Sequence, residues 1–103
     1  MIDLIDEHRT ATAALCRKFH VARLEIFGSA ADDTFDEEAS DLDFLVEFLP
    51  GQSLGPWLSV YFDLKSELEQ LFGRSVDLVM SGALKNPYFI REVNRTRRLV
   101  YAS

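Results

Sequence analysis

Three acidic residues give the sequence its clearest capacity for chemistry. Asp41 and Asp43 lie two residues apart in the segment DLDFLVEF, which reads as a strand, so both carboxylates project from one face. The other face of that strand is wholly apolar and is expected to be buried. Two neighbouring carboxylates repel each other unless a positive group neutralises them, and a hard divalent cation with oxygen ligands does so. Phosphoryl-transfer enzymes use such an arrangement to hold a nucleoside triphosphate through magnesium, so Asp41 and Asp43 are candidate metal ligands.

A third acid, Asp77, lies inside the short apolar segment SVDLV, which predicts a strand over 76–80. Burying such an acid without a partner is costly. If this strand lies beside 41–48, Asp41, Asp43 and Asp77 converge as metal ligands, and Asp77 could accept the proton of an attacking hydroxyl. Taken singly, a D-x-D pair is more often a solvent-facing edge, and a lone strand acid is more often part of a salt bridge.

A Gly28-Ser29 turn follows a predicted strand over 21–27. Glycine allows a tight turn and a close approach of the backbone to a ligand. Ser29 is expected to begin a short helix, whose free amides suit a phosphate. A Gly-Ser pair alone is usually only a turn, so the nucleotide-binding interpretation rests on its combination with the three acids.

The remaining elements are predicted from periodicity and from helix-end signals. They are a helix over 3–19, a helical turn and loop over 30–40, a helix from Leu54 to Leu71 with Gly73 at its end, and a helix begun by Asn86-Pro87 and continuing to about Arg97. This alternation predicts an α/β (α+β) fold, a small mixed sheet with helices packed on it, as one domain over 1–103. The helical stripe containing Trp57 and Tyr61 is expected to face the core, with exposure to a partner as the alternative. His8 and His20 are expected on the surface.

Composition limits the possible partners. The chain has 103 residues, a net charge of −6 and a single cysteine, Cys16, expected to be a buried thiol. The acidity argues against direct binding of nucleic acid. No apolar run is long enough to cross a membrane, and the cytoplasm is the expected location. The chain has no room for a domain that binds an acceptor, so another molecule should present it.

Four segments together resemble a known family: LEIFGSA, SDLDFLVEF, VDLV and NPYFIREV. Their arrangement is similar to that of the nucleotidyltransferase superfamily related to DNA polymerase beta, and more closely to the minimal nucleotidyltransferases of the MntA-like type. The resemblance implies a nucleotidyltransferase fold, Mg²⁺, and ATP or another nucleotide as substrate. It also implies an antitoxin that forms a hetero-oligomer with a HEPN-domain toxin and transfers AMP to a toxin tyrosine.

The chain departs from the family pattern immediately after the Gly-Ser turn. Relatives usually read G-S-x-A-R-G, whereas Asp32 and Asp33 stand here in place of the arginine and glycine. Asp32 would reverse a charge beside a polyanion if it lies close to the nucleotide. Two functions therefore stay open: AMP transfer to the toxin, or masking of a basic toxin surface without catalysis. Transfer to a small molecule such as an aminoglycoside would need an acceptor domain.

Overall fold

The computed structural model describes residues 2–28, 41–51, 53–83 and 85–103. The predicted turn and loop over 30–40, together with Ser29, Asp32 and Asp33, lie outside the described residues.

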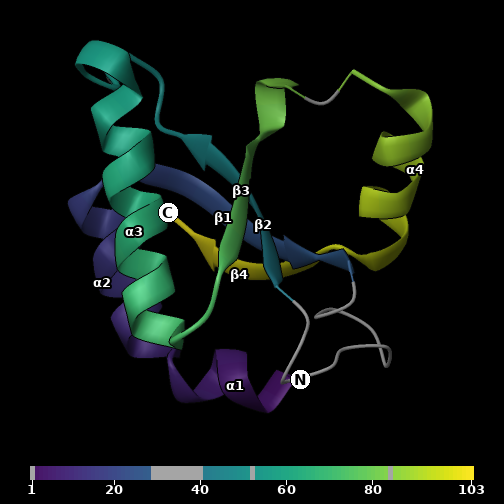
Figure 1. Ribbon diagram of the computed structural model, residues 1–103, viewed down its shortest axis with the longest axis horizontal. Coiled ribbons are helices and arrows are strands. Elements are labelled where there is room, and N and C mark those ends of the chain that lie inside the picture. Colours follow the sequence, from purple (N-terminus) through teal and green to yellow (C-terminus); the bar gives the residue numbers. More distant parts are fainter. Residues whose placement is uncertain (1, 29–40, 52, 84) are drawn as a thin grey trace.

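Four strands form one mixed sheet in the order β3-β2-β1-β4 (Figure 1). They are β1 (Val21–Phe27), β2 (Leu42–Phe48), β3 (Val76–Met80) and β4 (Arg98–Ala102). β1 runs antiparallel to both β2 and β4, while β2 runs parallel to β3. Because β2 and β3 are parallel neighbours, residues at the start of each strand meet at one end of the sheet.

The helices pack on both faces of this sheet. They are α1 (Ile2–Glu7), α2 (Arg9–Lys18), α3 (Ser59–Phe72) and α4 (Pro87–Thr96), with short 3-10 turns η2 (Pro56–Leu58) and η3 (Ser81–Ala83). In Figure 1, α2 and α3 lie together on the left, whereas α4 lies apart on the right. Among the described helices, none is long and apolar enough to cross a bilayer. The expected mixed sheet with packed helices is therefore confirmed.

The main core lies between the sheet and α1, α2 and α3. Its buried side chains come from all four strands and these three helices: Ile5, Cys16, Val21, Leu24, Ile26, Leu42, Phe44, Val46, Leu64, Leu68, Phe72, Val76, Leu78 and Val100. Cys16 is fully buried as predicted, and that burial raises the pKa of its thiol to about 12. The apolar face of β2 is thus buried as the sequence indicates.

A smaller cluster occupies the opposite face, beneath α4. It contains Phe27, Leu45 and Val93, with Val79 packed against it. The ring of Phe89 on α4 meets that of Phe27 edge to face, with centroids 5.8 Å apart. Asp43, two residues before Leu45 on the same strand, shares this second face.

The predicted helix-end signals have the expected geometry. Gly73 follows α3 with a φ of 67°, in the left-handed region that glycine adopts readily. The Asn86 side chain accepts hydrogen bonds from the amides of Tyr88 and Phe89, and Pro87 is the first residue of α4. α4 therefore begins at the residue that its sequence predicts.

Other details differ from the sequence predictions. The single helix expected over 3–19 is two helices that separate at His8, and residues 98–102 form an edge strand that was not predicted. His8 is half-buried rather than on the surface, with its ring 5.1 Å from that of Phe72, whereas His20 is exposed as expected.

The start of α3 also departs from prediction. The helix begins at Ser59, because Trp57 and Leu58 both have a φ of 56°, which breaks the helical path. Trp57 is consequently 95% exposed, so its expected place in the core is wrong. Tyr61 does pack against the core, and its hydroxyl donates a hydrogen bond to the Leu78 carbonyl.

Candidate functional site

The structure brings Asp43 and Asp77 side by side. β2 and β3 are hydrogen-bonded neighbours, and Asp43 is the register partner of Asp77. Neighbouring strands lie about 4.8 Å apart, so the two carboxylates lie within reach of one shared ligand. Asp41 is exposed just before β2, two residues from Asp43. The strand adjacency on which the sequence-based site depends is therefore present.

The surroundings of Asp43 oppose its ionisation. The pKa of this half-buried carboxyl is raised to about 6, first by burial and then by the nearby charges of Asp77 and Asp41. All three causes act in the same direction. A bound cation would counteract these causes and lower the pKa of Asp43, because it favours the ionised form.

The donor set suits magnesium shared with a phosphate. Within the described parts of the chain, no group of three His, Cys, Asp or Glu side chains forms a complete metal site. Mg²⁺ is usually held by one or two carboxylates together with substrate phosphates and water, so a pair such as Asp43 and Asp77 fits it. The role of Asp41 as a third ligand stays a prediction.

Gly28 lies directly against the carboxylate of Asp43. Its φ is 73°, and a Cβ at this position would lie 2.5 Å from Asp43 Oδ2. Only glycine therefore fits both the backbone conformation and the space. Its amide donates a hydrogen bond of 2.9 Å to Thr96 Oγ1, so this donor is already used within the protein.

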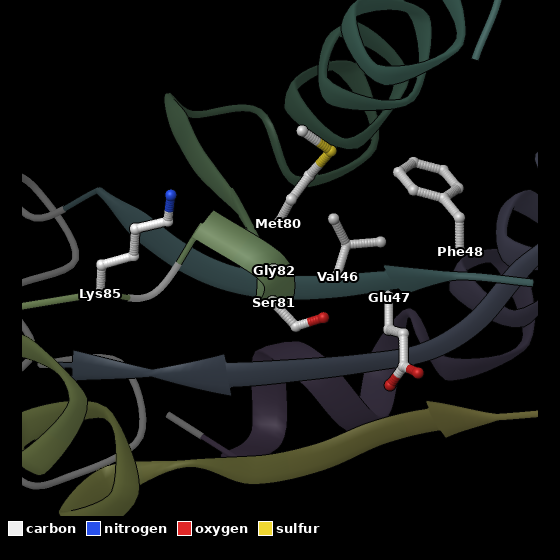
Figure 2. A pocket seen from close by; sticks show the side chains of 7 residues that line it. All are labelled: Val46, Glu47, Phe48, Met80, Ser81, Gly82 and Lys85. Carbon is white, nitrogen blue, oxygen red and sulfur yellow. The ribbon is translucent and has the colours of Figure 1, made fainter.

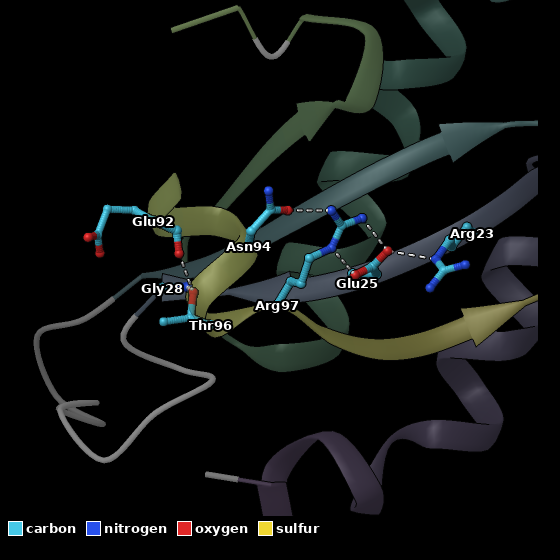
Figure 3. Close-up of polar contacts among 7 residues, drawn as sticks. All are labelled: Arg23, Glu25, Gly28, Glu92, Asn94, Thr96 and Arg97. Atoms are coloured by element: carbon cyan, nitrogen blue, oxygen red, sulfur yellow. Dashed lines mark hydrogen bonds and ion pairs between the residues drawn. The ribbon is translucent and has the colours of Figure 1, made fainter. Parts of the chain in front are cut away.

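A buried glutamate with two arginine partners, on the same face, was not found by the sequence reasoning (Figure 3). Glu25 is 3% exposed and accepts two hydrogen bonds from Arg97, from Nε at 2.6 Å and from Nη2 at 2.7 Å. Arg23 Nε donates a third, also at 2.6 Å. The hydrogen bond from Arg97 is the largest cause of a lowered pKa for Glu25. A glutamate inside the otherwise buried segment LEIF is the signal that could have indicated a cationic partner.

A pocket lies elsewhere on the sheet. It measures about 580 Å³ and is lined by residues at the ends of β2 and β3 and from the turn beyond β3: Val46, Glu47, Phe48, Met80, Ser81, Gly82 and Lys85. Figure 2 shows Val46, Phe48 and Met80 on one side of the strands, and Glu47 and Ser81 on the other. Asp43 and Asp77 are at the opposite ends of the same strands. The pocket therefore contributes nothing to the carboxylate site.

Comparison with known proteins finds relatives whose sequences match most of this chain. A family model described as "Nucleotidyltransferase domain" matches residues 8–100. Two Methanocaldococcus jannaschii proteins, each named "Putative protein adenylyltransferase", are similar to this chain. One is 37% identical over 91 residues, covering 88% of this chain and 85% of the relative. The other is 39% identical over 75 residues, covering 73% and 75% respectively.

Solved structures with the same fold include members of toxin-antitoxin complexes. A structure described as a "putative minimal nucleotidyltransferase" has a TM-score of 0.73 and 33% identity, with 93% of this chain and 92% of that chain covered. A toxin-antitoxin with AMP-PNP has a TM-score of 0.67, 18% identity and coverages of 92% and 73%. The complex of a tri-AMPylated Shewanella oneidensis HEPN toxin with its MNT antitoxin has a TM-score of 0.65, 16% identity and coverages of 96% and 73%.

The last two likenesses establish the fold alone, whereas the family match and the first structure extend to sequence over nearly the whole chain. Together with the mixed sheet and the paired aspartates, they confirm the resemblance to minimal nucleotidyltransferases. The chain belongs to the nucleotidyltransferase domain family.

Proposed function

We propose that this protein is a Mg²⁺-dependent adenylyltransferase that transfers AMP from ATP to a tyrosine hydroxyl of a HEPN-family toxin and so acts as its antitoxin. The observation that carries the proposal is the register pairing of Asp43 with Asp77, with Gly28 against Asp43. Relatives named as protein adenylyltransferases support the reaction type. Neighbours that contain AMP-PNP or an AMPylated HEPN toxin support the nucleotide and the partner.

A few residues would form the proposed nucleotide site, each with its own role. Asp41, Asp43 and Asp77 would hold Mg²⁺, which supplies charge neutralisation for the triphosphate when bound. Ser29 and the amides that follow it would receive phosphate oxygens. Gly28 would contribute the turn conformation, because its own amide is bonded to Thr96.

Asp77 is proposed as the base that acts on the acceptor. It is exposed, whereas Asp43 is half-buried, so a hydroxyl from a separate protein can reach Asp77 more easily. The hydroxyl oxygen would form a bond to the α-phosphorus while the bond to pyrophosphate breaks, and Asp77 would take the hydroxyl proton. The products are an AMP ester of the tyrosine and free pyrophosphate.

Binding without catalysis remains the second candidate, and one surface feature favours tight binding. Trp57, Leu58 and Phe62, at the start of α3, are 95%, 41% and 54% exposed. Exposed aromatic residues are typical anchors of protein interfaces. A toxin that covers these residues would be compatible with either function.

Intact mass spectrometry of the toxin distinguishes the two functions. A HEPN-family toxin is mixed with this protein, ATP and Mg²⁺, and we expect the toxin to gain one or more AMP units. Asp43→Asn and Asp77→Asn should abolish the gain, whereas Asp63→Asn, an exposed acid on α3, should retain it. A tight complex whose toxin gains no mass would replace transfer by masking. Arginine and glycine would then be introduced at Asp32 and Asp33 to learn whether those acids silence the site.

A further inference from the structure

The Thr96 hydroxyl joins α4 to the Gly28 turn (Figure 3). Thr96 is the last residue of α4 and is 7% exposed. Its Oγ1 donates a hydrogen bond of 3.0 Å to the Glu92 carbonyl and accepts one of 2.9 Å from the Gly28 amide. One side chain thus connects two segments that are 68 residues apart in sequence.

Gly28 is the point at which the turn meets the carboxylate pair. The space between its backbone and Asp43 Oδ2 is too small for a Cβ. A small displacement of Gly28 toward Asp43 would therefore force the Asp43 carboxylate to move. The hydrogen bond that the Gly28 amide donates to Thr96 Oγ1 fixes the residue at which such a displacement would begin.

α4 is itself held firmly against the sheet. Val93 is fully buried in the smaller cluster, and Phe89 packs on Phe27, the residue before Gly28. Arg97, which follows Thr96, makes the two hydrogen bonds to buried Glu25. Contacts of the residues before and after Thr96 therefore hold it in place against the sheet.

We propose that Thr96 is a positioning residue for nucleotide binding: its hydroxyl holds the Gly28 amide and thereby fixes Gly28 against the Asp43 carboxylate. This inference rests on the proposed nucleotide site. It assigns Thr96 an indirect role through Gly28, with no contact to the nucleotide.

A second buried threonine provides a matched control. Thr12 in α2 is fully buried, and its hydroxyl donates to the His8 carbonyl at 2.7 Å, which is the same helix-internal bond that Thr96 makes. Threonines often make such bonds to the carbonyl four residues earlier, so this bond alone indicates no function. The feature that Thr96 adds is the hydrogen bond from Gly28.

The test compares Thr96→Val, Thr96→Ser and Thr12→Val. Hydrogen exchange of the Gly28 amide is measured by NMR without ligand, and the Kd of a non-hydrolysable ATP analogue with Mg²⁺ is measured by calorimetry. Thr96→Val should accelerate Gly28 exchange and weaken binding about tenfold, as losses of supporting hydrogen bonds commonly do. Thr96→Ser keeps the hydroxyl and should match the unaltered protein in both measurements. Thr12→Val should lower the melting temperature while leaving the Kd unchanged.

The result separates this inference from the proposed function. If the unaltered protein binds the analogue and Thr96→Val binds it equally well, the positioning role is wrong while the nucleotide site stands. Equal loss of affinity in Thr12→Val and Thr96→Val would also overturn it, because the effect would then be general destabilisation. If the unaltered protein binds no analogue, the proposed nucleotide site fails and the inference fails with it.

Discussion

Glu25 and Asp43 lie on the same face of adjacent strands, yet their surroundings are opposite in charge. Glu25 pairs with Leu45 in the β1–β2 register, and Asp43, two residues earlier on β2, pairs with Phe27. Two arginines bond to Glu25 and its pKa is lowered. Asp43 is beside Asp77 and near Asp41, and its pKa is raised to about 6.

The contrast separates a carboxylate whose charge is compensated within the protein from one whose charge is not. The charge of Glu25 is compensated within the protein, because Arg97 holds both of its oxygens. The environment of Asp43 favours a cation supplied from outside, because burial and two like charges oppose its ionisation. Perturbed carboxylates in such clusters are common at functional sites, where stability is given up for binding.

The largest expected effect comes from removing Arg97, which makes two hydrogen bonds to the Glu25 carboxylate and offsets its charge. Arg97→Met should lower the free energy of unfolding by about 3 kcal/mol, because it leaves a buried charge without its main partner. Urea denaturation measures the change. Arg95→Met is the control, since Arg95 pairs with exposed Glu92 at the surface and should cost less than about 1 kcal/mol. Equal losses in the two variants would contradict a structural role for the pair of Arg97 with buried Glu25.

Gly28→Ala tests how closely the turn approaches Asp43. The left-handed backbone and the 2.5 Å contact with Asp43 Oδ2 should together cost about 2 kcal/mol. Gly73→Ala provides the comparison, because Gly73 has a similar φ of 67° and nothing within 4 Å of its added Cβ. Its cost, about 1 kcal/mol, reports backbone strain alone. Thermal melts that give the same loss for both glycines would show that the contact with Asp43 is unimportant.

A smaller effect with the opposite sign is expected at Asp43. Without ligand, Asp43→Asn should raise the free energy of unfolding at pH 7 by on the order of 1 kcal/mol, a value reduced for the partial exposure of this carboxyl. Below its ordinary pKa of 3.8 the carboxyl is protonated in both states and the variant should gain little. Between pH 3.8 and about 6 the unfolded chain has lost the proton that the folded protein still holds, so the gain should grow with pH, and above about 6 it should level off.

Denaturation curves of both proteins from pH 4 to pH 8 measure this difference. Glu25 acts in the other sense, because the stability that it contributes is lost as pH falls through its lowered pKa. A difference between the unaltered protein and Asp43→Asn that does not change with pH would contradict the electrostatic account of Asp43.

Local patterns predicted most of the framework, since they depend on near neighbours in sequence. Alternation along 41–48 predicted the burial of the face of β2 that carries Leu42, Phe44 and Val46, and the Asn86-Pro87 pair predicted the start of α4. The pairing of Asp43 with Asp77 could be expected only on the condition that their strands lie together, and the register supplies that condition. The catalytic and metal-binding roles of Asp41, Asp43 and Asp77 stay predictions.

The missed features depend on contacts between distant segments. Nothing near Glu25 in sequence identifies Arg97 as its partner, and Thr96 acquires its second hydrogen bond only because α4 returns to β1. The edge strand β4 is short and partly exposed, so its sequence pattern is weak. The strand is recognised only from its pairing with β1. Trp57 fits the helical stripe in sequence, but its left-handed backbone directs it to solvent.

The most direct test is calorimetric titration of Mg²⁺ with a non-hydrolysable ATP analogue into the protein alone. We expect binding that requires both components and that is lost in Asp43→Asn, even though this variant is more stable without ligand. Asp63→Asn should bind as the unaltered protein does. Undiminished binding by Asp43→Asn would contradict the claim that the paired carboxylates hold the nucleotide through magnesium.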